Sequence, residues 1–238
     1  MKVKLPNVRK LFLPDRGYTI IDCDLSGADA QVVAWEANDD DLKRAFRLGL
    51  NVHNHNGESM WGDAYNPKSK PRVYTMRDEL KRAVHGTNYG AAARTIAITL
   101  GWKIAEAEDF QRRWFALHPG IKAWHTRTDF DLQTTRTIRN RFGYRIVYFD
   151  RSDNLLPTAL AWTPQSTVAV IASRGAVRLR ALPWVTILLQ VHDSVVFQIP
   201  NHRFTKTDLA TIREHLTVAV PYDDPLTIPW GLAASRVS

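Results

Sequence analysis

The most informative hydrophobic pattern lies late in the chain, where two short apolar runs flank a polar centre. The runs, residues 187–191 and 195–199, are rich in Val, Ile and Leu, which favours strands over helices. Between them stand His192, Asp193 and Ser194, and Asp and Ser suit a turn because their side chains bond nearby backbone groups. The pattern predicts a β-hairpin whose tip carries Asp193, either as a simple turn residue or as a carboxylate offered to a ligand.

A second apolar run, residues 18–23, predicts a strand that ends at Asp24. Ser26 is a suitable helix N-cap, and the residues after it predict a helix over 28–37. Asp24 is therefore expected at the carboxyl end of a strand, just before a helix. Taken alone, this position is as typical of a capping or turn residue as of a functional acid.

The middle of the chain is predicted to be mostly helical, and its last part is predicted to contain both helices and strands. Pro164 is expected to precede a helix. His53 and His55 are expected in a polar loop or at a substrate contact, because their spacing matches no zinc-binding pattern. The periodicity predicts helices over residues 42–48, 76–85, 91–100, 104–117, 121–135, 165–181 and 206–218, and a closing strand over 226–232.

One of these helices carries a stripe of polar chemistry. Arg77, Lys81, His85 and Tyr89 recur every four residues, so their side chains fall on one face of the helix. Two long cations followed by two rings suit a triphosphate at one end and a base at the other. Acidic residues at 78 and 79 leave open the alternative of an ordinary solvated face.

Charge adds a preference for phosphates. The 238 residues carry a formal net charge of +8, with a pI of about 9.7, as expected of a protein that meets nucleic acid. Arg139, Arg141 and Arg145 lie among Gly and Tyr in a strand-like segment, which fits a contact with backbone phosphates or a plain basic hairpin. The length is enough for one large domain or two lobes that share a core.

Cysteine usage and hydropathy narrow the setting. Cys23 is the single cysteine, so an internal disulfide is excluded and a reducing interior is expected. No apolar run approaches the ~20 residues of a membrane-spanning helix, and the first residues lack the apolar core of a signal peptide. We therefore expect no membrane partner.

Three segments in the right order resemble the motifs of the family A DNA polymerases, the group built on the plan of bacterial DNA polymerase I. Residues 24–29, Asp-Leu-Ser-Gly-Ala-Asp, are similar to the family's Asp-x-Ser-x-x-Glu. Residues 77–90 follow the spacing of its Arg-x3-Lys-x3-(Phe/Tyr)-Gly-x2-Tyr-Gly, and residues 192–194, His-Asp-Ser, are similar to its His-Asp-Glu. Lesser similarities extend the resemblance over nearly the whole chain, at residues 9–14, 49–53, 115–120 and 165–167.

The resemblance implies an α+β fold, with an antiparallel palm sheet and its helices, a helical fingers subdomain, and no thumb or exonuclease domain. The palm would be discontinuous, comprising residues 1–35 and 155–238, and the fingers would comprise residues 36–154. Few residues precede Asp24, so the chain would be a trimmed form, a naturally minimal enzyme, or one half of a split enzyme whose partner chain supplies the thumb and exonuclease.

The resemblance also implies template-directed DNA synthesis, in which a nucleotide is transferred to a primer 3′-hydroxyl. This chemistry needs two divalent ions about 3.5–4 Å apart, for which Mg²⁺ is expected and Mn²⁺ can substitute. Asp24 and Asp193 would be the metal ligands, assisted by the carbonyl of Leu25. That assignment requires residues 24 and 193, far apart in the chain, to end side by side.

Further roles follow from the same resemblance. Lys81 would be catalytic as well as nucleotide-binding, by offsetting the charge that develops on the triphosphate. The residues expected to bind the dNTP are Arg77, Lys81, His85, Tyr89, Asp29 and His53, and those expected to bind primer-template DNA are Gln165, His192, Arg139, Arg141 and Arg145.

Four positions depart from the family's pattern. Asp29 stands where the family has a longer Glu that excludes the ribose 2′-hydroxyl, so the sugar gate would be looser unless a closer backbone compensates. His85 replaces Phe or Tyr, Ser194 replaces a Glu near the metals, and Gln31 replaces an Arg.

Two alternatives stay open. One is a single-subunit RNA polymerase or a sugar-relaxed nucleotidyltransferase, which would have the same fold and metals. The other is a non-catalytic nucleic-acid-binding subunit, against which the joint presence of Asp24, Arg77, Lys81 and Asp193 argues. The expected location is the cytoplasm of a bacterial or phage-infected cell.

Overall fold

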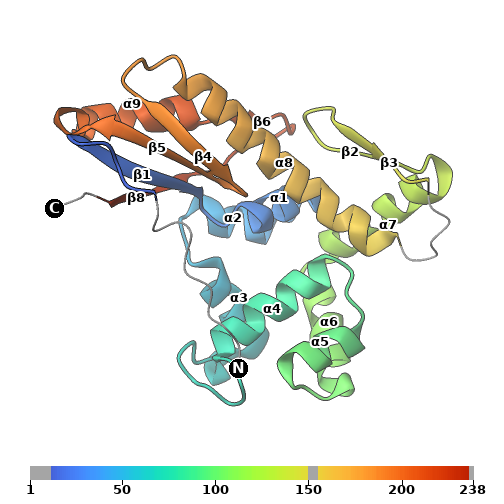
Figure 1. The fold of residues 1–238 in the computed structure, drawn as a ribbon. Coiled ribbons are helices and arrows are strands. Elements are labelled where there is room, and N and C mark those ends of the chain that lie inside the picture. Colours follow the sequence, from blue (N-terminus) through green and yellow to red (C-terminus); the bar gives the residue numbers. More distant parts are fainter. Residues whose placement is uncertain (1–11, 150–154, 236–238) are drawn as a thin grey trace, which may run out of the picture. The chain divides into compact units, whose positions relative to one another are not determined.

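The computed structural model describes residues 12–149 and 155–235, and the chain divides into two compact units (Figure 1). The first, here called the sheet unit, comprises Met1–Ala28 and Val168–Ser238, and the second, here called the helical unit, comprises Asp29–Thr167. The predicted α+β fold class with an antiparallel sheet is confirmed. The predicted palm and fingers, which were divided after residues 35 and 154, stay predictions.

The helical unit is one continuous segment of the chain, inserted between the two segments of the sheet unit. In chain order the helices and strands are β1 (Tyr18–Leu25), α1 (Ala28–Glu36), α2 (Asp40–Arg47), α3 (Val52–Trp61), η2 (Gly62–Ala64), α4 (Met76–Asn88), α5 (Ala93–Leu100), α6 (Ile104–Leu117), α7 (Pro119–Thr134), β2 (Thr137–Arg139), β3 (Arg145–Val147), α8 (Leu156–Leu179), β4 (Thr186–Val191), β5 (Ser194–Pro200), η3 (Asn201–Arg203), α9 (Lys206–Leu216), β6 (Ala219–Val220), β7 (Leu226–Thr227) and β8 (Trp230–Ser235).

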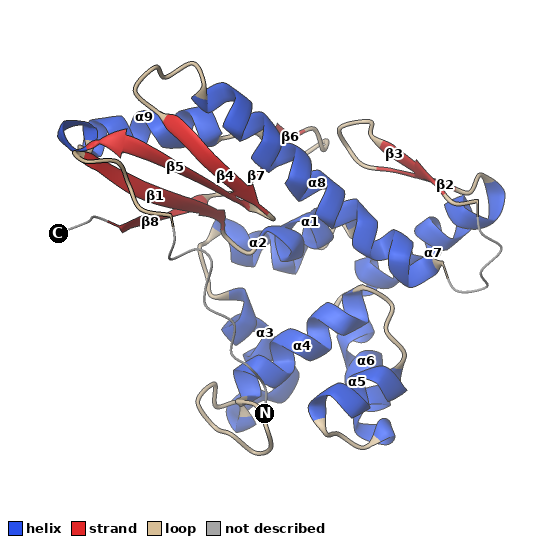
Figure 2. Cartoon of the chain, viewed as in Figure 1, coloured by secondary structure: helices blue, strands red, loops and turns tan. Residues whose placement is uncertain are grey.

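The sheet unit is built on four strands in the order β4-β5-β1-β8, with every neighbouring pair antiparallel (Figure 2). Successive side chains of a strand point to opposite faces. In β1 the residues Thr19, Ile21, Cys23 and Leu25 are at most 1% exposed, so they form the face that turns toward the core. Phe197 lies opposite Ile21 and is fully buried on the same face.

Helix α9 and the part of α8 after Val168 lie along one side of this sheet (Figure 1). They approach each other closely because Gly175 has no side chain, and a Cβ added there would lie 3.0 Å from the carbonyl oxygen of Leu216. Trp230 of β8 donates a hydrogen bond from its indole nitrogen to the same oxygen, at 3.1 Å. These contacts join α8 to α9 and α9 to the edge strand β8.

Helix α4 of the helical unit is fixed near its carboxyl end by two polar contacts. The indole nitrogen of the fully buried Trp114 donates to Oδ1 of Asn88 at 2.8 Å. Nε2 of His125 donates to the carbonyl oxygen of Asn88, also at 2.8 Å. Because α4 carries the predicted nucleotide-binding stripe, α6 and α7 together determine how this stripe is presented.

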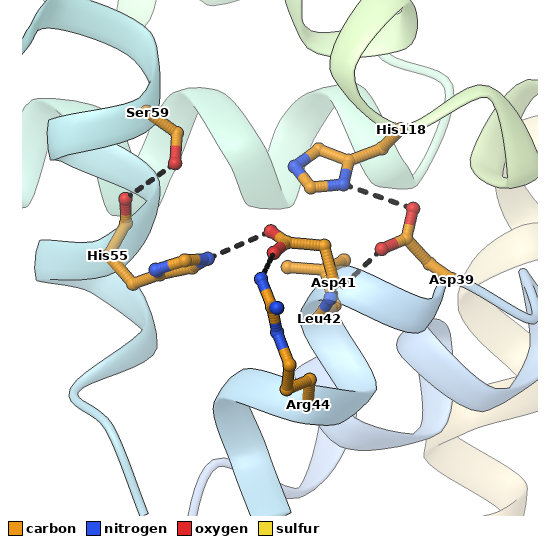
Figure 3. A network of polar contacts seen from close by, with 7 residues as sticks. All are labelled: Asp39, Asp41, Leu42, Arg44, His55, Ser59 and His118. Atoms are coloured by element: carbon orange, nitrogen blue, oxygen red, sulfur yellow. Dashed lines mark hydrogen bonds and ion pairs between the residues drawn. The ribbon is translucent and has the colours of Figure 1, made fainter. Parts of the chain in front are cut away.

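Two Asp–His pairs join α2 to neighbouring helices of the same unit (Figure 3). Asp39 caps α2 by accepting from the amide of Leu42 at 2.9 Å, and its other oxygen contacts Nδ1 of the buried His118 at 3.0 Å. Asp41 contacts Nε2 of His55 on α3 at 2.8 Å. The polar loop predicted around His55 is wrong, because Asn51 caps a helix there by accepting from an amide in its first turn.

Helix α8 is the second correction. It was expected to begin after Pro164, but it starts at Leu156 and continues through the proline. Proline in a helix removes one backbone hydrogen bond and crowds the preceding turn. Burial offsets this local cost, because Ala159 and Leu160 in the added turns are fully buried.

The predicted closing strand over 226–232 is also wrong, since β7 and β8 are separate. Pro229 lies between them and cannot donate to a ladder, while its carbonyl accepts from the amide of Ser26 at 3.0 Å. Among the helices that the structure describes, none is long and apolar enough to cross a bilayer.

Candidate functional site

The sheet unit brings two predicted acids to one end of its sheet. Asp24 lies within β1 rather than after it, directly opposite Ser194 of β5 and flanked on the other side by Gly231 of β8. Asp193 precedes Ser194 in the two-residue turn between β4 and β5, and its carbonyl accepts from the amide of Leu25 at 3.1 Å. At the level of the backbone, residues 24 and 193 therefore end side by side.

Strand alternation explains why Asp24 is available. Its neighbours Cys23 and Leu25 point into the core, so Asp24 points to the opposite face and is exposed. Burial, with the neighbouring charge of Asp22, raises the pKa of the Cys23 thiol to about 12, although Arg213 acts in the other direction. A thiol with this pKa is not a nucleophile near neutral pH, so the carboxylates are the reactive groups at this end.

His192 begins the turn and has a φ of 53°. Residues other than glycine adopt this left-handed region infrequently, and such conformations gather at functional sites. The side chain of His192 is exposed, in keeping with its predicted contact to DNA. The turn thus holds an exposed ring and a carboxylate on consecutive residues.

The oxygen donors at this end suit a hard divalent cation. Mg²⁺ prefers a few carboxylates together with carbonyl, phosphate and water oxygens, and Asp24, Asp193 and the Leu25 carbonyl are donors of that type. Ser194, which replaces the acid of the family motif, contributes a hydroxyl whose oxygen is buried. Across residues 12–149 and 155–235, no cluster of three or more His, Cys, Asp or Glu side chains forms a metal cage.

The helical unit contains the predicted cationic stripe. Thr75 caps α4 by accepting from the amide of Asp78 at 3.2 Å, which fixes where the helix begins and hence where Arg77 and Lys81 fall. His85 lies on the last turn, and its ring meets that of Tyr89 edge-on, with the centroids 4.4 Å apart. The hydroxyl of Tyr89 donates to Oδ2 of Asp29 at 2.9 Å, so the stripe ends in a ring pair joined to α1.

Titration behaviour shows that these residues interact. Burial, together with the positive charges of Arg77 and Lys81, lowers the pKa of His53 to about 4, against a smaller opposite effect of Asp78. Burial also lowers the pKa of His85, with Asp29 opposing and Lys81 adding to the effect. At neutral pH this site therefore offers two permanent cations and two neutral imidazoles to an anion.

Tyr89 and Asp29 form a coupled pair at the other end of the stripe. Burial raises the pKa of the Tyr89 hydroxyl, and the charge and hydrogen bond of Asp29 raise it further. The phenol therefore keeps its proton and stays a donor to the carboxylate. This arrangement holds the Tyr89 ring in a fixed place, as expected of a residue that lines a base or sugar pocket.

A second basic group lies on the β2–β3 hairpin. Arg139 and Arg145 are directly opposite each other and both are exposed. Like charges placed opposite on a sheet repel, and among the described residues neither side chain forms an ion pair. The adjacent pair Ile138 and Ile146 turns inward to a core cluster, so the arginines face outward.

Two further predicted DNA contacts, Arg141 and Gln165, belong to the same unit as this hairpin. Arg141 contacts Oε1 of Glu36 at 3.4 Å, and Gln165 is exposed on the early part of α8. A pocket of about 630 Å³ lies beside the hairpin, with acidic residues as well as cations in its wall. The residues that line it are Glu36, Trp124, Thr126, Arg127, Thr128, Phe130, Asp131, Ile138, Arg139, Asn140, Arg141 and Thr163.

Sequence reasoning missed the residue that shapes the hairpin. Asn140 is buried, and its Oδ1 accepts from the amides of Phe142 and Tyr144, both at 3.1 Å. Its amide nitrogen donates to Oγ of Ser166 at 3.1 Å, which ties the turn to α8. An Asn followed three residues later by Gly143, whose φ is 87°, is a turn signal that could have identified it.

The predicted residues thus form separate groups within the two units. Asp24, Leu25, His192 and Asp193 gather at the end of the sheet. Tyr89 donates a hydrogen bond to Asp29, and the charges of Arg77 and Lys81 act on the pKa of His53. A third group lies around the β2–β3 hairpin and consists of Arg139, Arg141, Arg145 and Gln165.

An antiparallel sheet with acids at one end, together with a helical unit that carries cations, defines a fold of the polymerase type. The model of DNA polymerase family A matches residues 2–235, so the chain belongs to DNA polymerase family A. It is 29% identical to a thermostable DNA polymerase I of Thermus filiformis, over 94% of this chain and 28% of that protein. It is 26% identical to DNA polymerase I of Pseudomonas aeruginosa, over 96% of this chain and 26% of that protein.

A phage protein and a solved structure are similar as well. The DNA polymerase of Mycobacterium phage D29 is 26% identical over 82% of this chain and 31% of that protein. The polymerase domain of Pol1 from M. smegmatis, solved with DNA primer-template and dNTP, has a TM-score of 0.82 at 22% identity, over 96% of this chain and 41% of that chain. The chain spans less than a third of the length of these full-length relatives.

Proposed function

We propose that this chain carries the nucleotidyl-transfer site of a template-directed DNA polymerase, which adds a dNTP to a primer 3′-hydroxyl. The observation that carries the proposal is the β1–β5 ladder, which brings Asp24 beside Asp193 in a chain that belongs to DNA polymerase family A. Asp24, Asp193 and the Leu25 carbonyl would hold Mg²⁺, with Mn²⁺ as a substitute. When bound, the divalent ions activate the attacking hydroxyl and neutralise charge on the phosphates.

The helical unit would bind the triphosphate. Arg77 and Lys81 offer permanent cations from one face of α4, and Lys81 would also offset the charge that develops during transfer. His53 is neutral near pH 7, because its pKa is about 4, so it would act as an uncharged hydrogen-bonding group toward the triphosphate. His85 and Tyr89 would line the pocket for the base and sugar.

DNA would be held mainly through its phosphates. Arg139 and Arg145 face outward as an adjacent pair of cations, an arrangement that an anion stabilises. Arg141, Gln165 and His192 would add contacts to template or primer. Since phosphate contacts carry no sequence information, this binding would be insensitive to sequence.

Primer extension by the purified chain tests the proposal most simply. With a primer-template, dNTPs and Mg²⁺, the wild-type chain should add nucleotides complementary to the template. Asp193→Asn should lose this activity while keeping its circular dichroism spectrum, because the substitution removes a charge from an exposed turn. Extension by Asp193→Asn at the wild-type rate would contradict the proposal.

Sugar choice distinguishes DNA synthesis from the sugar-relaxed alternative. The specific observation is the bond between Tyr89 and Asp29, which places a carboxylate shorter than the family's Glu beside the ring pair. We propose that Asp29 sets the preference for deoxynucleotides. Asp29→Ala should lower the ratio of dNTP to rNTP incorporation, whereas an unchanged ratio would remove Asp29 from sugar selection.

The curated relatives are much longer than the part that this chain matches, and this bears on how processive the enzyme would be. We propose that processive synthesis needs a thumb-like element, supplied by further residues of the protein or by a separate chain, in the cytoplasm of a bacterial or phage-infected cell. Similarity to polymerases from bacteria and a phage supports that setting. The 238 residues alone should extend primers distributively, so product length should depend on the ratio of enzyme to DNA.

A further inference from the structure

Ser194 has an unusual position at the end of the sheet. It is the first residue of β5 and lies directly opposite Asp24. The hydrogen bond from the Leu25 amide to the Asp193 carbonyl joins the residues on either side of this pair, so residues 24 and 194 form a non-hydrogen-bonded pair of the antiparallel ladder. In such pairs the Cα atoms approach more closely, and both side chains point to the same face.

The hydroxyl of Ser194 is enclosed and unused. The residue is 4% exposed, and its Oγ has no hydrogen-bond partner among the described residues. The residue opposite it on the other neighbouring strand is Val191, which offers no polar side chain. A buried hydroxyl is normally paired, so one that is not paired and lies beside an exposed acid is a donor available to that acid.

We propose that Ser194 is a positioning residue for the cation site, and that its hydroxyl donates to the Asp24 carboxylate when that carboxylate holds a divalent ion. This role rests on the proposed function. The bond would hold the carboxylate in one orientation toward the ion, as partners of metal ligands do in other proteins. The two side chains lie on the same face of the ladder, and the Ser194 side chain has a single rotatable bond that moves its oxygen.

The residue type matters for the kind of site that results. An acid at this position would add negative charge beside Asp24, and could itself compete for the cation. A serine adds no charge, so the affinity of the site would rest on two carboxylates whose orientation a hydroxyl holds. Loss of such a partner typically weakens metal binding about 10-fold or more.

Binding of Mn²⁺, measured by electron paramagnetic resonance without nucleotide or DNA, tests this role apart from activity. Ser194→Ala should raise the dissociation constant about 10-fold, and Ser194→Thr, which keeps the hydroxyl, should restore most of the affinity. Ser59→Ala in α3 is the matched control, because this exposed serine donates only to a backbone carbonyl of its own helix, and it should bind Mn²⁺ like the wild type.

Thermal unfolding of each variant separates positioning from packing. A lower melting temperature in Ser194→Ala with unchanged Mn²⁺ affinity would overturn the proposal, because the hydroxyl would then matter only to the fold. Equal weakening in Ser194→Ala and Ser194→Thr, with both folded, would also overturn it. If wild-type protein and Asp24→Asn bind Mn²⁺ equally, the cation site of the proposed function fails, and the role of Ser194 fails with it.

Discussion

The sheet unit and the helical unit place their functional groups by different means. In the sheet unit, backbone hydrogen bonds of the β1–β5 ladder set the positions of Asp24 and Asp193, whose side chains are short. In the helical unit, the period of α4 sets only the direction of Arg77 and Lys81, and their long flexible side chains would have to reach the proposed triphosphate. We therefore expect function to depend strictly on the positions of the two carboxylates and to tolerate changes in the positions of the two cations.

Charge sharpens the same contrast. The end of the sheet brings two acids together, and one face of α4 carries two cations, so each region would stabilise a ligand of the opposite sign. In the helical unit this effect is visible in the lowered pKa of His53, to which Arg77 and Lys81 contribute after burial. A divalent ion and a triphosphate are the ligands that would relieve the repulsion in the two regions.

Lengthening one acid should have the largest effect. Asp24→Glu keeps the charge but moves the carboxylate by about one bond length past the position fixed by the ladder, and misplacement of about 1 Å can cost about 100-fold in rate. We expect primer extension to fall by that factor or more, almost as far as in Asp24→Asn. A Glu variant that retains most of the activity would break the contrast, since the acids would then be as tolerant as the cations.

Changing one cation should have a smaller and graded effect. Lys81→Ala removes a charge-assisted hydrogen bond worth about 1.5–3 kcal/mol, so kcat/KM for dNTP should fall about 10- to 100-fold. Lys81→Arg should recover part of this loss, because a long side chain can still reach the phosphates. Arg112→Ala, in an exposed ion pair on α6, is the control and should change kcat/KM little. Equal losses in Lys81→Arg and Lys81→Ala would contradict the tolerant geometry.

Arg139 and Arg145 should contribute to DNA affinity through ionic contacts that depend on salt concentration, and not to the chemical step. Replacing Arg139 and Arg145 together with Ala should reduce the slope of log affinity for duplex DNA against log salt by about 2, one for each phosphate contact. Affinity should fall by a similar factor for any sequence, and Arg112→Ala should leave the slope unchanged. A double variant with the wild-type slope would remove the hairpin from the DNA contact.

The smallest effect concerns pH. The folded protein lowers the pKa of His53 from about 6.5 to about 4, so the unfolded chain binds its proton more readily between these values. Stability therefore rises with pH from about 4 to about 6.5 and is lost as pH falls through that window. His85 and His125, whose pKa values burial also lowers, act in the same direction.

The contribution of His53 to the pH dependence of stability is measured by comparing the wild type with His53→Gln. Urea unfolding at pH 4.5, 5.5 and 6.5 should show a weaker pH dependence in His53→Gln than in the wild type. Lys81→Ala should raise the pKa of His53 in an NMR titration, because it removes one of the charges that lower it. An unchanged His53 pKa in Lys81→Ala would contradict the claim that the charge of Lys81 lowers this pKa.

Local patterns were sufficient to predict much of each unit. The hairpin around Asp193 and the helix Ile104–Leu117 are confirmed, because short apolar runs and a sustained helical period are strong signals. Gly101 ends α5 with a φ of 69°, as the residue type indicated. The four-residue spacing on α4 likewise indicated which side chains share a face.

Tertiary contacts decided what the local patterns could not. Helix α8 continues through Pro164 because distant residues bury the turns before it, and no local signal reports such burial. The pairing of β1 with β5 joins residues 170 or more positions apart, and residue types alone do not specify which strands pair. Family resemblance, rather than periodicity, was what pointed to Asp24 and Asp193 as one site.

A double-mutant cycle on cation binding tests the central claim most directly. Mn²⁺ affinity would be measured by water-proton relaxation for the wild type, Asp24→Asn, Asp193→Asn and the double variant. If the two acids form one site, each single variant should lose nearly all of the affinity and the double variant should be little worse, so the effects should not add. Losses that add independently, or a single variant that binds like the wild type, would contradict the claim that the β1–β5 ladder builds one cation site.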